Sequence, residues 1–292
     1  MTTDPTAATD RDPDRDPDPV ARFRRDVSSG STIFAPGAQD CFTAKLAEAA
    51  GHRAVYMGGF ATSAAIYGKP DVGLLTATEM VAHARNIVEA VSVPVFADAD
   101  NGHGNPLNVR RMIADYERAG VAGVHIEDQV SPKKCGNLPG RHVVPVAEMV
   151  EKIKAAVDVR RNADFVIAVR SDAWHEEGTD ALIERGQAYA EAGADVLWPL
   201  LYNCADRTEI ARVGRAFDIP LMGSLVNYSQ TAFIDLDEWA GLGFTVIISP
   251  FGALQAAAPV MLALFAEMRE TGSLKGWADR LMPFDDVTDM LG

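Results

Sequence analysis

The chain has 292 residues, and 48% of them are hydrophobic, which is enough apolar surface to form a large core and excludes disorder of the whole chain. Its 27 basic residues are outnumbered by 41 acidic ones, giving a net charge of -14, and no Lys/Arg cluster stands out that could neutralise a phosphate backbone. Nucleic-acid binding is therefore not expected. The sequence also lacks the pattern of a signal peptide and the run of about 18 apolar residues that a membrane span needs.

Residues 1–20 alternate Asp, Pro, Arg and Thr without any apolar period. Such a composition cannot offset the entropy lost on ordering, so we expect a disordered acidic tail. An arm that binds a partner is the alternative interpretation. Residues 21–292 are expected to form a single domain, because barrels of about 250 residues commonly fold as one unit.

From Phe23 onward, short β-branched runs alternate with longer stretches of helical period, which is the pattern of βα units around a parallel sheet. The candidate strands are residues 32–36, 53–57, 93–97, 121–126, 165–170, 196–199, 220–225 and 244–249. Eight repeats favour a closed (β/α)8 TIM-type barrel. The alternative is a doubly wound open sheet, but PGAQD at 36–40 is not the glycine-rich phosphate loop that usually follows its first strand.

Amphipathic stretches lie between these strands, among them residues 77–91, 105–119, 146–161 and 179–192, and several end in Gly or Ala-Gly. A long apolar helix is predicted at residues 254–268, beyond the eighth strand. This is more helix than one barrel needs. Packing against the core and packing against another subunit are both consistent with its composition.

The third strand runs into Asp98 and Asp100, which are separated only by Ala99. Period-two alternation points both carboxylates the same way at the rim where barrels place their functional groups. Two close carboxylates repel unless a cation or proton neutralises them, and hard oxygen ligands suit Mg²⁺. The alternative is an Asp-rich turn that caps the next helix, since Gly102 and Gly104 mark a loop.

Two neighbouring strands add more charge to this rim. The fourth strand ends with Glu127 and Asp128, and a third carboxylate beside the first two favours a metal cluster over separate helix caps. The fifth strand ends with Arg170 and Asp172. An Arg at this position could bind a substrate carboxylate through two hydrogen bonds.

The loop after the fourth strand contains Cys135 directly behind two lysines. Neighbouring ammonium groups lower the pKa of a thiol, so Cys135 is a candidate acid or nucleophile. Cys41 and Cys204 lack such neighbours and receive no role. Three widely spaced cysteines without a CxxC pair are typical of a reducing compartment, and we therefore expect a cytoplasmic protein.

Taken together, five segments resemble the isocitrate lyase and phosphoenolpyruvate mutase superfamily over nearly the whole chain after about residue 22. They are YMGG at 56–59, GKPDVG at 68–73, DADNGHGN at 98–105, HIEDQ at 125–129 and PKKCG at 132–136. The KKCG loop resembles the lyase branch, including methylisocitrate and dimethylmalate lyases, because the mutases and phosphonopyruvate hydrolases lack its Cys. The resemblance further implies a homotetramer, a dimer of dimers whose last helix is exchanged between subunits.

Roles for individual residues follow from this resemblance. Tyr56 would take the proton of the substrate hydroxyl, and Cys135 would protonate the carbanion left on the second product. Mg²⁺, with Mn²⁺ as an alternative, would be held by Asp98, Asp100 and, through water, Glu127. The small-molecule carboxylate substrate would contact Arg170, Gly58, Gly59, Asp71, Lys133, Gly136, Asn137 and Ser224.

Several positions depart from the lyase pattern. Asn137 replaces the His that usually follows KKCG, and Leu200 replaces the Glu of the family's FPE segment. The strand-seven segment ANMTE becomes residues 223–227, with Ser224 and Val226 in place of polar contacts, and Gly252 replaces a Ser. These changes imply retained chemistry on an altered, less charged or bulkier substrate.

Three functions remain open from the sequence. The first is a lyase for a 2-hydroxy di- or tricarboxylate, and the second is an oxaloacetate-type decarboxylase or hydrolase, or a phosphonopyruvate-processing enzyme. The third is a barrel that binds without catalysis. Cys135 favours the first over the second, because protonating a carbanion requires an acid that hydrolysis does not. The carboxylate cluster disfavours the third.

Overall fold

The computed structural model describes residues 18–226, 231 and 234–292, and it is built around eight parallel strands. The strands are β1 (Ile33–Pro36), β2 (Val55–Met57), β3 (Val95–Asp98), β4 (Gly123–Glu127), β5 (Val166–Ser171), β6 (Val196–Pro199), β7 (Met222–Ser224) and β8 (Val246–Ser249). Each lies within or overlaps one of the eight predicted segments. The predicted (β/α)8 barrel is confirmed.

The barrel closes through two groups of strands. Strands β2 to β6 pair in sequence order, and β8 pairs between β1 and β7. Single bridges between Gly37 and Tyr56 and between Leu197 and Leu221 join the two groups. Since all pairs are parallel, the carboxyl ends of the eight strands meet at one rim.

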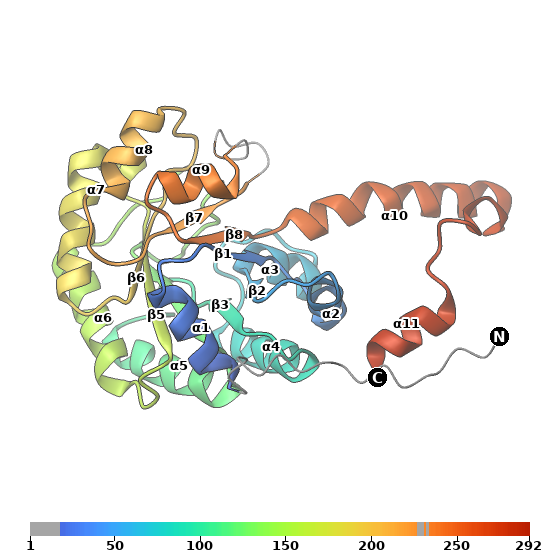
Figure 1. Ribbon diagram of the computed structural model, residues 1–292, viewed down its shortest axis with the longest axis horizontal. Helices are drawn as coiled ribbons and strands as arrows, with labels where there is room; N and C mark the ends of the chain where they lie inside the picture. The colour runs from blue at the N-terminus through green and yellow to red at the C-terminus, as the bar shows by residue number, and fades with distance from the viewer. Residues whose placement is uncertain (1–17, 227–230, 232–233) are drawn as a thin grey trace.

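Helices surround this barrel (Figure 1). Outward-facing strand residues such as Val55 and Val124 belong to the same buried cluster as Met80 and Ile113 of the surrounding helices. The helices up to β8 are α1 (Pro19–Ser28), α2 (Cys41–Ala49), α3 (Gly59–Tyr67), α4 (Ala77–Ala90), α5 (Pro106–Ala119), α6 (Val146–Val159), α7 (Trp174–Glu191), α8 (Arg207–Gly214) and α9 (Leu236–Gly241). Inside α7 the chain bends at Gly178, whose φ of 82° is left-handed, so the regular part begins at the predicted Thr179.

Helix α1 covers the amino-terminal end of the barrel. Phe23 stacks on Phe96 of β3 with ring centroids 5.5 Å apart, and Arg22 donates to the carbonyl of Ser92 at 2.8 Å. The side chain of Asp18 caps the helix by accepting a hydrogen bond from the Val20 backbone amide. Helix α1 therefore begins two residues inside the expected 1–20 tail, and residues 1–17 lie outside the described part of the chain.

The chain continues past β8 into α10 (Gly252–Thr271), a 3-10 turn (Lys275–Trp277) and α11 (Phe284–Leu291). Helix α10 projects from the barrel as an arm, and α11 returns to contact α2 (Figure 1). No residue of α10 is buried, and Leu262 and Phe265 are 70% and 59% exposed. Within the described residues, no helix is long and apolar enough to cross a membrane.

Candidate active site

A pocket of about 480 Å³ opens at the carboxyl ends of the strands. The predicted site residues that line it are Tyr56, Gly58, Gly59, Asp71, Asp98, Cys135, Gly136, Asn137, Arg170 and Ser224. The remaining lining residues are Phe60, Trp198, Leu200, Tyr202, Val226, Pro250 and Phe251. Asp100, Glu127 and Lys133 are also buried near this rim but do not line the pocket.

Asp98 and Asp100 are held at the end of β3 by backbone hydrogen bonds and a tight turn. The two oxygens of Asp98 accept hydrogen bonds from the amides of Gly59 and Asp100, each at 2.8 Å. Asp100 itself has a left-handed φ of 48°, which turns the chain directly after the strand. The strand therefore fixes the first carboxylate, and the turn fixes the second.

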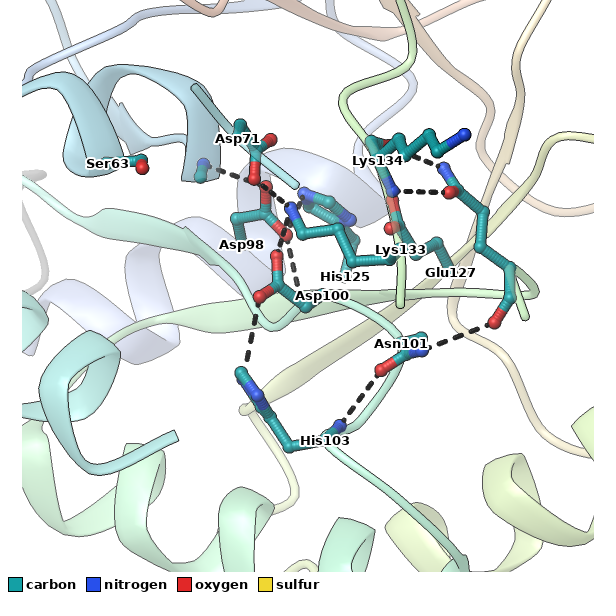
Figure 2. Close-up of polar contacts among 12 residues, drawn as sticks. Ser63, Asp71, Asp98, Asp100, Asn101, His103, His125, Glu127, Lys133 and Lys134 are labelled. Carbon is teal, nitrogen blue, oxygen red and sulfur yellow. Dashed lines mark hydrogen bonds and ion pairs between the residues drawn. The ribbon is translucent and has the colours of Figure 1, made fainter. Parts of the chain in front are cut away.

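Lys133 reaches between the carboxylates of Asp71 and Asp100 (Figure 2). Its ammonium lies 2.7 Å from Asp71 and forms a second ion pair with Asp100. Burial would lower the pKa of Lys133, but the surrounding carboxylates outweigh that effect and raise it. In this structure Lys133 neutralises protein carboxylates, and its predicted contact with substrate stays a prediction.

Gly59 lies close to both aspartates and to Lys133. A Cβ atom added at Gly59 would lie 2.9 Å from Asp98 Oδ2, 3.0 Å from Lys133 Nζ and 3.3 Å from Asp100 Oδ1. The fully buried Glu127 Oε1 has no hydrogen-bond partner. Among the described residues no three acidic, His or Cys side chains converge as a ready metal cluster. Asp98 and Asp100 offer hard oxygen ligands that suit a cation, and the Lys133 ammonium lies beside them, while Glu127 stands apart.

Burial and mutual repulsion disfavour the ionised forms of Asp98 and Asp100 unless a proton or a cation neutralises part of their charge. Burial raises the pKa of Asp100 to about 7, with added repulsion from Asp98 and Asp71 and partial compensation by Lys133. Burial also opposes the ionisation of Asp98, but the neighbouring His125, the charge of Lys133 and the two amide hydrogen bonds lower its pKa. Asp98 is therefore the firmly ionised member of the pair.

Arg170 is gripped by two carboxylates. Its Nη1 lies 2.9 Å from Glu127, and its Nε and Nη2 each lie 2.9 Å from the oxygens of Asp172. Asp172 also pairs with Arg141 at 2.8 Å, which ties the Cys135 loop to the end of β5. The guanidinium lies 5.0 Å above the ring of Trp198. Arg170 is therefore fixed before any substrate binds.

Asp128 supports this strand end from outside the pocket. Its oxygens accept hydrogen bonds from the Ser171 hydroxyl at 2.7 Å, the Asp172 amide at 2.9 Å and the Tyr189 hydroxyl at 2.9 Å. Burial raises the pKa of Asp128 to about 6 despite these bonds. Although the sequence places Asp128 beside Glu127, its side chain serves the scaffold around Asp172.

Sequence reasoning missed His125, which is fully buried against Tyr56. Its Nε2 lies 2.8 Å from the Tyr56 hydroxyl and 3.4 Å from Asp98 Oδ1. Burial lowers the pKa of His125 to about 4 and raises that of Tyr56 well above its usual value, so both groups are neutral. The available signal was period two on β4, which points His125 the same way as Glu127.

Cys135 is 9% exposed and lies against the pocket, with its amide donating to the carbonyl of Asp71 at 2.9 Å. The expected reason for its activation is wrong: burial raises the pKa of the thiol instead of lowering it. Lys133 is committed to carboxylates, and Lys134 donates to the carbonyl of Gly140 at 3.0 Å. Such a thiol remains protonated, which suits a proton donor better than a nucleophile.

Comparisons with known proteins agree with this geometry. The family model described as phosphoenolpyruvate phosphomutase matches residues 23–269. The chain is 42% identical to 2,3-dimethylmalate lyase from Eubacterium barkeri over 94% of both chains. It is 38% identical to 2-methylisocitrate lyase from Bacillus subtilis, covering 88% of this chain and 83% of that protein.

Two solved structures are similar to this fold. Oxaloacetate acetylhydrolase with the inhibitor 3,3-difluorooxalacetate is similar with a TM-score of 0.88 and 30% identity over 95% of both chains. Phosphonopyruvate hydrolase with oxalate and Mg²⁺ gives 0.83 and 29%, over 93% of this chain and 94% of that one. As its motifs predicted, the chain belongs to the phosphoenolpyruvate mutase and isocitrate lyase superfamily and is an enzyme of the carbon–carbon lyase type.

Proposed function

We propose that this enzyme uses Mg²⁺, with Mn²⁺ as a substitute, to cleave a 2-hydroxy di- or tricarboxylate into a 2-oxo acid and a second carboxylic acid. The observation that carries the proposal is a protonated, buried Cys135 in the same pocket as Tyr56, Asp98 and Arg170. The names of the lyase relatives, which act on dimethylmalate and methylisocitrate, support the substrate class.

The metal would be held by Asp98 and Asp100, with Glu127 contributing through water. The burial of the paired Asp98 and Asp100 carboxylates and the unpartnered oxygen of Glu127 support this assignment. When bound, such an ion stabilises negative charge that develops on the substrate oxygens.

Removal of the hydroxyl proton falls to Tyr56 and His125. Tyr56 is neutral, so it can accept the substrate proton only as it releases its own. The neutral imidazole of His125 lies 2.8 Å away, a distance over which that proton can move. The positive charges of Arg170 and Lys133 favour the ionised phenol during this transfer.

Arg170 and the amino end of α3 would bind the 2-oxo acid half. The guanidinium is preorganised by Glu127 and Asp172, so little side-chain freedom is lost on binding. Gly58 and Gly59 place the start of α3 against the pocket, where its dipole favours a carboxylate. Cys135 then donates its proton to the carbanion of the departing half.

The direct test is a panel of 2-hydroxy di- and tricarboxylates incubated with pure enzyme and Mg²⁺, with pyruvate and glyoxylate measured as products. The proposal requires one of these 2-oxo acids to appear in stoichiometric amount with a second carboxylic acid. If no member of the panel is cleaved, the proposed function is wrong.

A hydrolase is the second candidate, because the fold superposes on oxaloacetate acetylhydrolase with a TM-score of 0.88. This alternative predicts that oxaloacetate is consumed and that a Cys135→Ser variant remains active, since water supplies the proton. Including oxaloacetate in the panel, with acetate and pyruvate as the measured products, separates hydrolysis and decarboxylation from cleavage of a hydroxy acid.

We further propose that the enzyme is a cytoplasmic homotetramer in which α10 packs on a neighbouring subunit. Leu262 and Phe265 on this arm expose apolar surface that a second copy could cover. The three cysteines are free thiols, which supports a reducing compartment. Light scattering during gel filtration tests the assembly, since a chain lacking residues 252–292 should lose the tetramer.

A further inference from the structure

Gln129, the last residue of the HIEDQ segment, is buried outside the pocket. Its neighbours Glu127 and Asp128 contact Arg170 and the end of β5, whereas Gln129 does not line the pocket and is only 1% exposed. A buried amide needs hydrogen-bond partners, because an unsatisfied donor or acceptor is costly. The partners that Gln129 has chosen therefore indicate what its side chain does.

The side chain of Gln129 holds the backbone of Lys134, the residue before Cys135. Its Oε1 accepts a hydrogen bond from the Lys134 amide at 2.8 Å, and its Nε2 donates to the Lys134 carbonyl at 2.9 Å. Both bonds are drawn at Lys134 in Figure 2. At neutral pH only the side chains of Gln and Asn carry such a donor and acceptor side by side. One amide thus fixes both backbone polar groups next to the thiol.

The backbone of Gln129 is itself held from two sides. It pairs in an antiparallel bridge with Val143, which joins the two ends of the Cys135 loop (residues 130–142). On the other side, Asn101 Nδ2 donates to the Gln129 carbonyl at 3.3 Å (Figure 2), and Lys152 donates to the Asn101 carbonyl at 3.1 Å. A side chain that starts from so fixed a backbone can position the group that it binds.

The other contacts of this segment differ in kind. Lys133 forms ion pairs with Asp71 and with the proposed metal ligand Asp100, so its contacts depend on the charge at the metal site. The Cys135 amide donates to the Asp71 carbonyl at 2.9 Å. Gln129 adds two hydrogen bonds between neutral groups, which do not depend on the charge of the metal site.

Beyond Cys135 the loop lies tightly against the pocket. A Cβ atom added at Gly136 would lie 2.7 Å from Arg170 Nη2 and 2.9 Å from Leu200 Cδ2. The thiol is therefore bounded on one side by this close approach and on the other by the bonds of Gln129. A misplacement of about 1 Å can lower a rate by about a hundredfold, so these bonds bear on proton transfer from the thiol.

We propose that Gln129 is a positioning residue, whose amide keeps the Cys135 loop against the pocket and sets the place of the thiol. This inference rests on the proposed lyase function, in which Cys135 donates the proton. It predicts that loss of the amide lowers kcat much more than it changes KM, because the groups that bind the 2-oxo acid half stay in place.

The first test is a double-mutant cycle on the full-length enzyme with Mg²⁺ and a substrate from the panel. Gln129→Met keeps the length of the side chain and removes both hydrogen bonds, so kcat should fall at least about tenfold while KM changes less than about threefold. In a Cys135→Ala background the same change should lower kcat by less than about threefold. Equal losses in both backgrounds overturn the inference, since Gln129 would then act on something other than the thiol.

Gln187→Met is the matched control, the same substitution at an exposed position of α7, and should change neither kcat nor KM.

The second test needs no substrate. Trypsin can cleave after Lys133 or Lys134 only when this segment opens, and mass spectrometry of the fragments gives the rate of that cleavage. Gln129→Met should speed it by about tenfold or more, and Gln187→Met should leave it unchanged. An unchanged rate in folded Gln129→Met removes the inference. Faster cleavage by trypsin, in an enzyme that cleaves no member of the panel, leaves the contact with the loop in place and removes only the lyase function.

Melting temperatures identify a Gln129→Met variant that fails to fold. Gln129→Glu then takes its place, because its carboxylate still accepts from the Lys134 amide but cannot donate to the Lys134 carbonyl. The same fall in kcat and the same faster cleavage by trypsin are expected. A Gln129→Glu enzyme with the wild-type kcat and the wild-type cleavage rate contradicts the inference.

Discussion

Strands β2 to β5 and strands β6 to β8 deliver different chemistry to the same pocket. The first group places Tyr56, Asp98 and Arg170 at the rim. The charge of Arg170 is balanced by the carboxylates of Glu127 and Asp172. The second group and the segments that follow it supply mainly apolar side chains, such as Leu200 and Val226. We therefore expect one half of the rim to carry out the reaction and the other half to contact the variable part of the substrate.

The largest effect is expected from Asp100→Ala, which removes one of the two carboxylates beside Gly59. Without it the charge developing on substrate oxygens loses its cation, so we expect kcat/KM to fall by at least about a thousandfold. Asp158→Ala is the matched control, since that carboxylate is 69% exposed in a surface ion pair. Loss of Mg²⁺ binding by calorimetry should accompany the loss of rate, and full turnover in excess EDTA would contradict the metal assignment.

Cys135→Ser should lower turnover by at least about a hundredfold, the usual contribution of a positioned acid, and leave the melting temperature nearly unchanged. Burial raises the pKa of the thiol, so the wild-type rate should hold through neutral pH and fall only as the pH passes that raised value. The variant should lose this alkaline decline. Cys41→Ser on α2 serves as the control. A variant that retains its rate would place the enzyme with the hydrolases.

A smaller effect is expected from Asp172→Asn, which leaves Arg170 and Arg141 without their shared carboxylate. Breaking a buried ion pair costs about 3 kcal/mol, and we expect kcat/KM to fall by about ten- to a hundredfold as Arg170 loses its fixed position. Asp180→Asn, in a surface pair with Arg212, should change neither quantity. Urea unfolding and steady-state kinetics measure both effects. Equal stability and rate would show that Glu127 alone positions the guanidinium.

The smallest effect is expected from deleting residues 1–17. Their composition offers nothing that could pack, so activity and melting temperature should stay within error of the full chain. Extending the deletion through residue 28 removes Phe23 from its stack on Phe96 and should destabilise the barrel by several kcal/mol. A fall in melting temperature with the shorter deletion would show that the tail contributes to the folded domain.

Local patterns were sufficient to predict the barrel. Every strand except β7 contains Val or Ile, and the residues that cap a helix, such as Thr76 and Glu79, lie close to each other in the chain. The same local logic located Asp98, Glu127 and Arg170, because strand ends of a parallel barrel share one rim. The sequence period and the parallel topology were therefore enough to predict the fold and to predict which charged residues lie at the rim.

The sequence could not predict which distant residues the ends of long side chains contact. Lys133 lies two residues before Cys135, yet its ammonium pairs with Asp71 and Asp100, which are far away in sequence. The expected lowering of the thiol pKa fails because burial outweighs the lowering effect of the Lys133 charge. The contact of Tyr56 with His125 joins two strands, and only the folded barrel brings these rings together.

The burial of Cys135 also makes its thiol a reporter of loop motion. Its 9% exposure and raised pKa mean that an alkylating reagent can react only while the segment around Gly136 swings away from Arg170 and Leu200. The alkylation rate of the unliganded enzyme then measures how often this segment opens, as hydrogen exchange does for a protected amide. A bound substrate analogue that contacts this segment should slow the labelling, so one cysteine records both how often the pocket opens and how firmly a ligand keeps it shut.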